Sequence, residues 1–137
     1  MKRAAIATAA GLLLFGAGCE EPAGLWRLQR LPSGRLLEVS SAQLVWGDDH
    51  GERLASEDCF QLSYVTSEPA ASQAARDREA VEAFELIRPL SELWGFDRAT
   101  LLSYPARRSP RIFDLYAFRR AGNGGWEWTR TRVEPPK

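Results

Sequence analysis

Hydrophobic and polar residues alternate with a period of two in several short stretches of the chain. The alternating stretches are residues 25–31, 35–39, 42–46, 59–65, 99–105, 111–120 and 125–133. A period of two places successive side chains on opposite faces of an extended chain, so these stretches predict β-strands. Residues 42–46 either continue the strand at 35–39 or form another short strand. The sequences PSG at 32–34 and AGNGG at 121–125 predict tight turns between neighbouring strands, and GDDHGE at 47–52 predicts a loop.

The apolar period lengthens to that of a helix in the middle of the chain. Ser67 followed by Pro69 is typical of a helix start, and Gly95 of a helix end. The apolar stripe consists of Ala80, Ala83, Phe84, Ile87, Leu90 and Trp94. The expected solvent face consists of Arg76, Asp77, Arg78, Glu79, Glu82 and Glu85. Pro89 disfavours helical geometry at Arg88, so we expect the helix to kink or restart there.

The order of these elements is strands, then helix, then strands. Such an order predicts an α+β domain, in which an antiparallel sheet of about five to six strands packs on one long central helix. We assign residues 25–137 to this single domain. A chain of this length buries enough surface to fold without disulfides, which agrees with its two cysteines.

The most apolar stretch of the chain lies near its N-terminus. Lys2 and Arg3 are followed by a segment, 4–15, in which all but two residues are apolar. The segment is too short to span a bilayer, which needs about 20 residues. It has instead the charged start and short apolar region of an export signal.

Three small residues at 16–18 stand directly before Cys19. This arrangement resembles the lipobox of bacterial lipoproteins, although Gly16 stands where that family usually has leucine. The resemblance implies that residues 1–18 are a signal peptide, and that the Cys19 thiol receives a diacylglycerol and becomes the first residue of the exported protein. Residues 19–24 would then be the lipidated N-terminus and a short tether. The alternative is a secretory signal followed by a chance cysteine.

This resemblance also implies a location. Acylated Cys19 would hold the domain on a lipid bilayer, facing the periplasm, because several acyl chains together bind firmly. In many lipoproteins an aspartate after the cysteine favours the inner membrane. Here that residue is Glu20, so the outer membrane is favoured over the inner one.

Charge is distributed unevenly, although the whole chain has 18 basic and 18 acidic residues. Residues 19–97 contain 7 arginines and 15 acids, whereas residues 98–137 contain 8 arginines, one lysine and 3 acids. Such asymmetry indicates either an interaction surface or two halves that face each other within one domain. A near-neutral periplasmic protein is a poor candidate for nucleic-acid binding, so we expect no nucleic-acid partner.

Residues with metal-binding or catalytic chemistry are few. The single histidine, His50, lies among acids in the expected loop, and we interpret this loop as solvated rather than as a calcium site. Glu79, Glu82 and Glu85 have interleaved arginines, as on a solvated helix face. Cys59 cannot form an intramolecular disulfide once Cys19 is lipidated, and its apolar neighbours favour burial. We therefore expect no catalytic residues, no metal and no cofactor.

The last strand carries the most specific group of residues. Trp126, Trp128, Arg130 and Arg132 share one face at a period of two, and such residues can form a partner-binding platform. The alternative is that the tryptophans cover the core while the arginines extend to solvent at the sheet edge.

Two functions follow from these features. The first is a non-catalytic domain that binds another cell-envelope protein. The second is a carrier with a cavity for a small apolar ligand between sheet and helix. Gly24 and Trp26 resemble the G-x-W that opens lipocalin-like barrels, a family of small-ligand binders, but a helix in mid-chain departs from that family.

Overall fold

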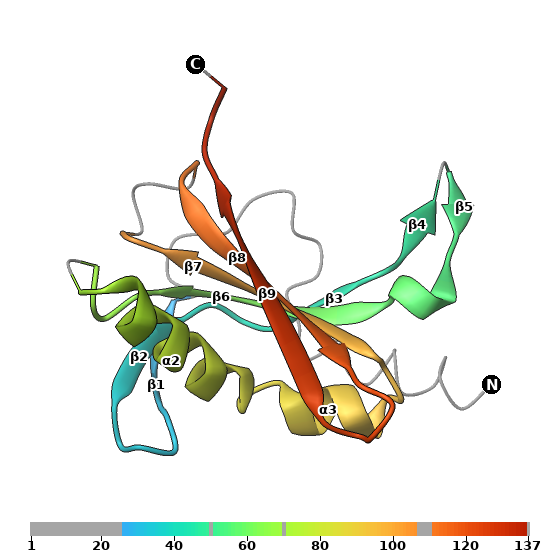
Figure 1. Ribbon diagram of the computed structural model, residues 1–137, viewed down its shortest axis with the longest axis horizontal. Coiled ribbons are helices and arrows are strands. Elements are labelled where there is room, and N and C mark those ends of the chain that lie inside the picture. Colours follow the sequence, from blue (N-terminus) through green and yellow to red (C-terminus); the bar gives the residue numbers. More distant parts are fainter. Residues whose placement is uncertain (1–25, 50, 70, 107–110, 137) are drawn as a thin grey trace.

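The computed structural model describes residues 26–49, 51–69, 71–106 and 111–136 (Figure 1). Seven of their strands form one sheet, in the order β1-β2-β6-β7-β8-β9, with β3 pairing with β6. The strands are β1 (Arg27–Arg30), β2 (Leu36–Val39), β3 (Gln43–Val45), β6 (Cys59–Val65), β7 (Arg98–Tyr104), β8 (Phe113–Arg120) and β9 (Trp126–Val133). Each alternating stretch of the sequence corresponds to one of these strands, with ends shifted by up to two residues. The sheet therefore has seven strands, whereas about five to six were predicted.

The sheet is mixed, so the prediction of an antiparallel sheet is wrong at one place. β6 and β7 run parallel, whereas the other described pairs of the sheet are antiparallel. Parallel neighbours need a crossover connection, and the helices between β6 and β7 supply it. This connection returns the chain to the end of the sheet where β6 began.

The prediction of one long central helix is also wrong, because the helical segment is divided in two. α2 spans Gln73–Phe84 and α3 spans Arg88–Leu93, with Pro89 in the first turn of α3. Proline has no amide hydrogen and its ring clashes with the preceding turn, so it cannot continue α2. The predicted restart at Arg88 is therefore confirmed.

The start of α2 differs from the prediction as well. Ser72, not Ser67, caps the helix, because its side-chain oxygen accepts a hydrogen bond from the backbone N–H of Ala75 at 3.2 Å. Ser67 has another role, since both its backbone N–H and its hydroxyl donate to the buried carboxylate of Glu79.

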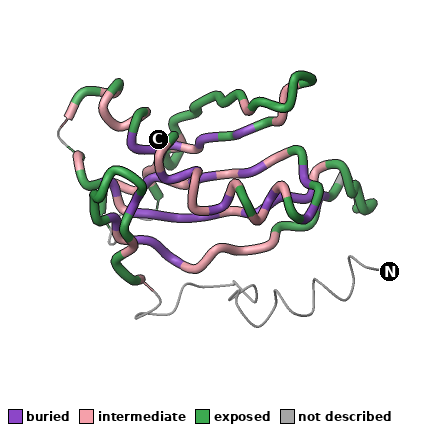
Figure 2. The backbone as a smooth tube through the Cα atoms, turned by 90° about the horizontal axis from the view of Figure 1, so that it is seen from below, coloured by how far each residue is buried: buried purple, intermediate pink, exposed green. Residues whose placement is uncertain are grey.

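The core lies between the sheet and the two helices. The predicted stripe is confirmed in the main: five of its six residues are buried and Leu90 is half-buried. The Phe84 ring stacks on that of Phe118 with centroids 4.0 Å apart, and the Trp94 ring meets Phe60 edge-on. Figure 2 shows buried stretches in the middle of the molecule and exposed stretches at the turns. In β7 and β8 buried residues alternate with more exposed ones, as expected for strands with one side facing the core.

The expected solvent face of α2 contains one error. Glu79 is only 2% exposed, and its carboxylate accepts hydrogen bonds from Thr66, Ser67 and Arg35. A buried carboxylate needs such partners, because burial without them is costly. Glu79 is one turn before Ala83, and this position turns it toward the core side of the helix.

The predicted loop at 47–52 contains a short hairpin, formed by β4 (Asp48–Asp49) and β5 (Glu52–Arg53). The 3₁₀-helix η1 (Ala55–Glu57) follows it. Asp58, which is 1% exposed, fixes the base of the hairpin by accepting from the Gly47 amide at 2.8 Å and from both terminal nitrogens of Arg53. His50 lies outside the described residues.

Candidate functional site

Strand β9, which carries the predicted binding residues, is the last strand of the sheet. It spans eight residues and pairs with β8 along one side; no described strand pairs with its other side. Trp126, Trp128, Arg130 and Arg132 lie on the face that points toward the helices, as the alternation predicted. The four side chains share this face, and two of them contact the helices: Trp126 donates to Glu92 of α3, and Arg130 donates to Asp77 of α2.

The two tryptophans differ in their surroundings. The Trp126 ring is half-buried against Phe84, with centroids 5.1 Å apart, and its indole N–H donates to Glu92 at 3.0 Å. This hydrogen bond lowers the pKa of Glu92 below its ordinary value. Trp128 packs beside the Tyr116 ring at 5.7 Å and stays 38% exposed. Trp126 therefore belongs to the rim of the core, whereas Trp128 presents its ring to solvent.

Arg130 joins the end of the sheet to helix α2. Its guanidinium donates to both carboxylate oxygens of Asp77, at 2.7 and 2.6 Å. Tyr116 and Gln73 donate to the same carboxylate, at 2.7 and 3.0 Å. Burial tends to raise the pKa of Asp77, but these hydrogen bonds outweigh it and the pKa falls below its ordinary value. Burial, and then donation to Asp77, raise the pKa of Tyr116.

Arg132 also has partners within the chain. It donates to Asp114 of β8 at 3.2 Å and to Glu134 at 3.4 Å, while its side chain remains 49% exposed. Asp114 is 3% exposed, so Arg132 supplies a counter-charge to a buried acid. The hydrogen bond to Asp114 raises the pKa of Arg132. Both arginines are thus positioned by the fold, and binding by this face stays a prediction.

Among the described residues, two ion pairs join the acidic and basic parts of the sequence. Arg130 meets Asp77, and Arg98 meets Glu57 with 2.5 Å between nitrogen and oxygen. In both pairs a basic residue from the last forty positions contacts an acid from the first part of the domain. For these four residues, the contacts favour the interpretation that the acidic and basic parts of the sequence face each other within one domain.

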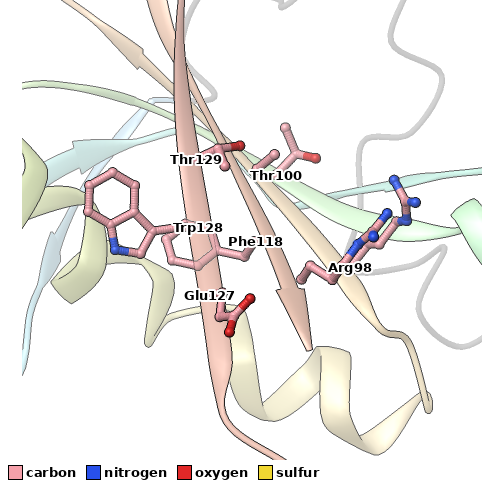
Figure 3. A pocket seen from close by; sticks show the side chains of 8 residues that line it. Arg98, Thr100, Phe118, Glu127, Trp128 and Thr129 are labelled. Atoms are coloured by element: carbon pink, nitrogen blue, oxygen red, sulfur yellow. The ribbon is translucent and has the colours of Figure 1, made fainter. Parts of the chain in front are cut away.

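The opposite face of β7, β8 and β9 contains a hollow that the sequence did not indicate (Figure 3). Pairing in the sheet arranges six of its lining residues in two rows, Arg98–Arg119–Glu127 and Thr100–Ala117–Thr129. In Figure 3 the rings of Trp128 and Phe118 extend to the helix side, away from Arg98 and Thr100. The volume of the hollow is about 410 Å³.

Other predicted features have the following outcomes. Cys59 is buried, as its neighbours indicated, and burial raises the pKa of its thiol. Within the described part of the chain there is no group of three or more metal-ligating residues and no helix long and apolar enough to cross a membrane. Cys19 and the predicted signal peptide lie outside the described residues.

Comparison of the chain with protein-family models, with curated proteins and with solved structures finds no match.

Proposed function

We propose that the protein is a lipoprotein, held on a bilayer through acylated Cys19 and facing the periplasm, with the outer membrane favoured. Its domain is non-catalytic and binds another cell-envelope protein along β9. The observation that carries the proposal is the position of Trp128, Arg130 and Arg132 on an eight-residue edge strand.

An edge strand suits protein binding because its outer backbone groups can pair with an extended segment of a partner. Such pairing supplies affinity, while alternate side chains supply specificity. Trp128 offers an exposed ring, and Trp and Arg are the residues most often found at the energetic centre of interfaces. Tyr116 behind Trp128 supports the ring from the sheet side.

The ion pairs of the two arginines agree with this role. Asp77 holds Arg130 and Asp114 holds Arg132, yet the side chains remain 33% and 49% exposed. A side chain that is already ordered loses less conformational entropy when a partner binds. These pairs therefore support a preorganised, partly exposed basic surface next to Trp128.

A double variant tests the proposal. We expect Arg130→Ala with Arg132→Ala to weaken binding of the envelope partner by at least about tenfold, because each truncation of a hot-spot residue loses about 2 kcal/mol or more. Binding of the wild type should weaken as salt rises, since exposed charges are screened over about 8 Å at physiological ionic strength.

The matched control removes two arginines from the opposite edge of the sheet. Arg27→Ala with Arg30→Ala changes the net charge equally but lies on β1. The melting temperature of both double variants is measured as well, because the loss of Arg130 also removes a hydrogen-bond partner of Asp77 and can lower stability. Unchanged capture with a lowered melting temperature in the β9 variant would assign its arginines to the fold alone.

We place the small-ligand carrier second. On the side of the sheet that faces the helices, a hollow of about 170 Å³ lies among residues of β1, β2 and β6 and the segment between α2 and α3. Pockets for small ligands usually measure about 300–1,000 Å³. Because this hollow is smaller than such pockets, the carrier function is the second proposal.

A further inference from the structure

The hollow on the other face of β7, β8 and β9 contains two neighbouring arginines, each with an acidic residue beside it. Arg98 and Arg119 are directly opposite each other on neighbouring strands, and like charges in that position destabilise a sheet. Glu57 offsets the charge of Arg98. Arg119 forms no ion pair with any residue that the structure describes. The donors of its guanidinium are therefore available to a ligand with a negative charge.

The floor of the hollow is formed by short side chains. Thr100, Ala117 and Thr129 are paired across the three strands, immediately next to the row of charged residues (Figure 3). Because these side chains are short, the space above them stays open, and its volume of about 410 Å³ is in the range of small-molecule sites. The two threonine hydroxyls can donate or accept hydrogen bonds there.

The charges around the hollow indicate what kind of molecule it fits. Arg98 and Arg119 are positive, whereas Glu57 beside Arg98 and Glu127 opposite Arg119 are negative. The four charges cancel, so a doubly charged phosphate would meet repulsion from two carboxylates. A ligand with a single carboxylate between the arginines would meet less repulsion. The Glu127 carboxylate can only accept hydrogen bonds, so a ligand group next to it must be a donor. An ammonium group is such a donor and also has the opposite charge.

We propose that this hollow binds a small molecule with a carboxylate and a neighbouring amino group, as in a free α-amino acid. The carboxylate lies between Arg98 and Arg119, and the amino group faces Glu127. The threonine hydroxyls contact the remaining polar atoms of the ligand. This site lies on the face opposite the β9 platform and does not depend on the function proposed above.

A titration followed by NMR tests the proposal on the full chain in detergent micelles. The probes are L-alanine, acetate, ethanolamine and inorganic phosphate, and the backbone amides of Ala117 and Thr129 report binding. We expect saturable shifts with L-alanine, affinity about tenfold lower for acetate because its hydrogen bonds to Glu127 are missing, and no saturation with ethanolamine or phosphate.

Two variants separate the roles of the charged groups. Arg119→Gln should reduce the affinity for L-alanine by at least about tenfold, since a charge-assisted hydrogen bond is lost. Without ligand its melting temperature should change little, because the relieved repulsion from Arg98 is offset by the lost attraction to Glu127 on the other side. Glu127→Gln should remove the preference for L-alanine over acetate. The control is Arg78→Gln on the exposed side of α2, which should leave all affinities unchanged.

Three results would overturn the proposal. They are the absence of saturable shifts with L-alanine, an equal affinity for phosphate, and unchanged L-alanine binding in Arg119→Gln. Because the readout is ligand binding at the face away from the β9 platform, the result is independent of whether an envelope partner binds β9.

Discussion

Among the described residues, three almost fully buried carboxylates each have an arginine partner. Asp58 pairs with Arg53, Glu79 with Arg35, and Asp114 with Arg132. A buried charge is tolerated only with a counter-charge and hydrogen bonds, so these pairs hold three regions of the fold in place. Asp77 is a fourth acid of this kind, less buried but with three side-chain donors around it.

The lowered pKa of Asp77 leads to a prediction about pH. Since the folded pKa lies below the unfolded one, ionised Asp77 adds stability that is complete above its ordinary pKa of about 4. That stability is lost as the pH falls through the folded pKa. We expect Asp77→Asn to lower the melting temperature at pH 7 by roughly 4 °C, corresponding to about 1 kcal/mol. The difference from the wild type should shrink as the pH falls below 4.

Thermal melts from pH 7 to acid check this prediction. The control is Asp97→Asn, an exposed acid that should change the melting temperature little at any pH. A deficit in Asp77→Asn that stays constant down to the lowest pH would show that the loss does not come from the carboxylate charge.

The sequence could have indicated one of these residues but not their partners. Glu79 lies one turn before Ala83, so closer attention to helical spacing would have placed it near the core. The partners could not be found from spacing, because Arg35 and Glu79 are 44 positions apart and Asp114 and Arg132 are 18 apart. Such pairs form only when strands and helices meet in three dimensions.

At the scale of elements, periodicity predicted where strands and helix lie but not how they are joined. The period of two located the strands, and in β7 and β8 it corresponds to core-facing residues alternating with more exposed ones. Strand direction leaves no trace in that period, so the parallel pair of β6 and β7 was missed. The division of the helix was visible in advance, because a single residue, Pro89, causes it.

The packing of α2 gives the prediction at this scale. Phe84 is 3% exposed and stacks on Phe118, so we expect Phe84→Ala to lower the free energy of unfolding by about 3–5 kcal/mol. Val81 on the same helix is 41% exposed, and Val81→Ala should change the free energy of unfolding by no more than about 0.5 kcal/mol. Denaturant unfolding measures both values. Similar small losses in the two variants would mean that Phe84 does not pack in the core.

At the scale of the whole molecule, the helices cover one face of the sheet and leave two surfaces at which we propose binding. One is the outer edge of β9, and the second is the hollow on the opposite face. The sequence pointed to the residues of β9 because tryptophan and arginine alternate there. It could not point to the hollow, whose residues come from three strands and become neighbours only through their register.

The proposed anchor gives a prediction for the whole molecule. We expect Cys19→Ser to remain unlipidated and to leave the membrane fraction, because the acyl chains would be what holds the protein to the bilayer. Fractionation of cells followed by a high-salt wash measures this. A variant that still sediments with membranes after the wash would show that another feature holds it there.

The central claim is that β9 contacts an envelope protein, and photo-crosslinking in intact bacterial cells tests it most directly. A photoreactive residue replaces exposed Thr131 on β9, and in a control it replaces Leu28, 67% exposed, on β1 at the opposite edge. We predict one discrete adduct with an envelope protein from position 131, absent from position 28 and lost in Arg130→Ala with Arg132→Ala. No adduct from position 131, or the same adduct from both positions, would contradict the claim.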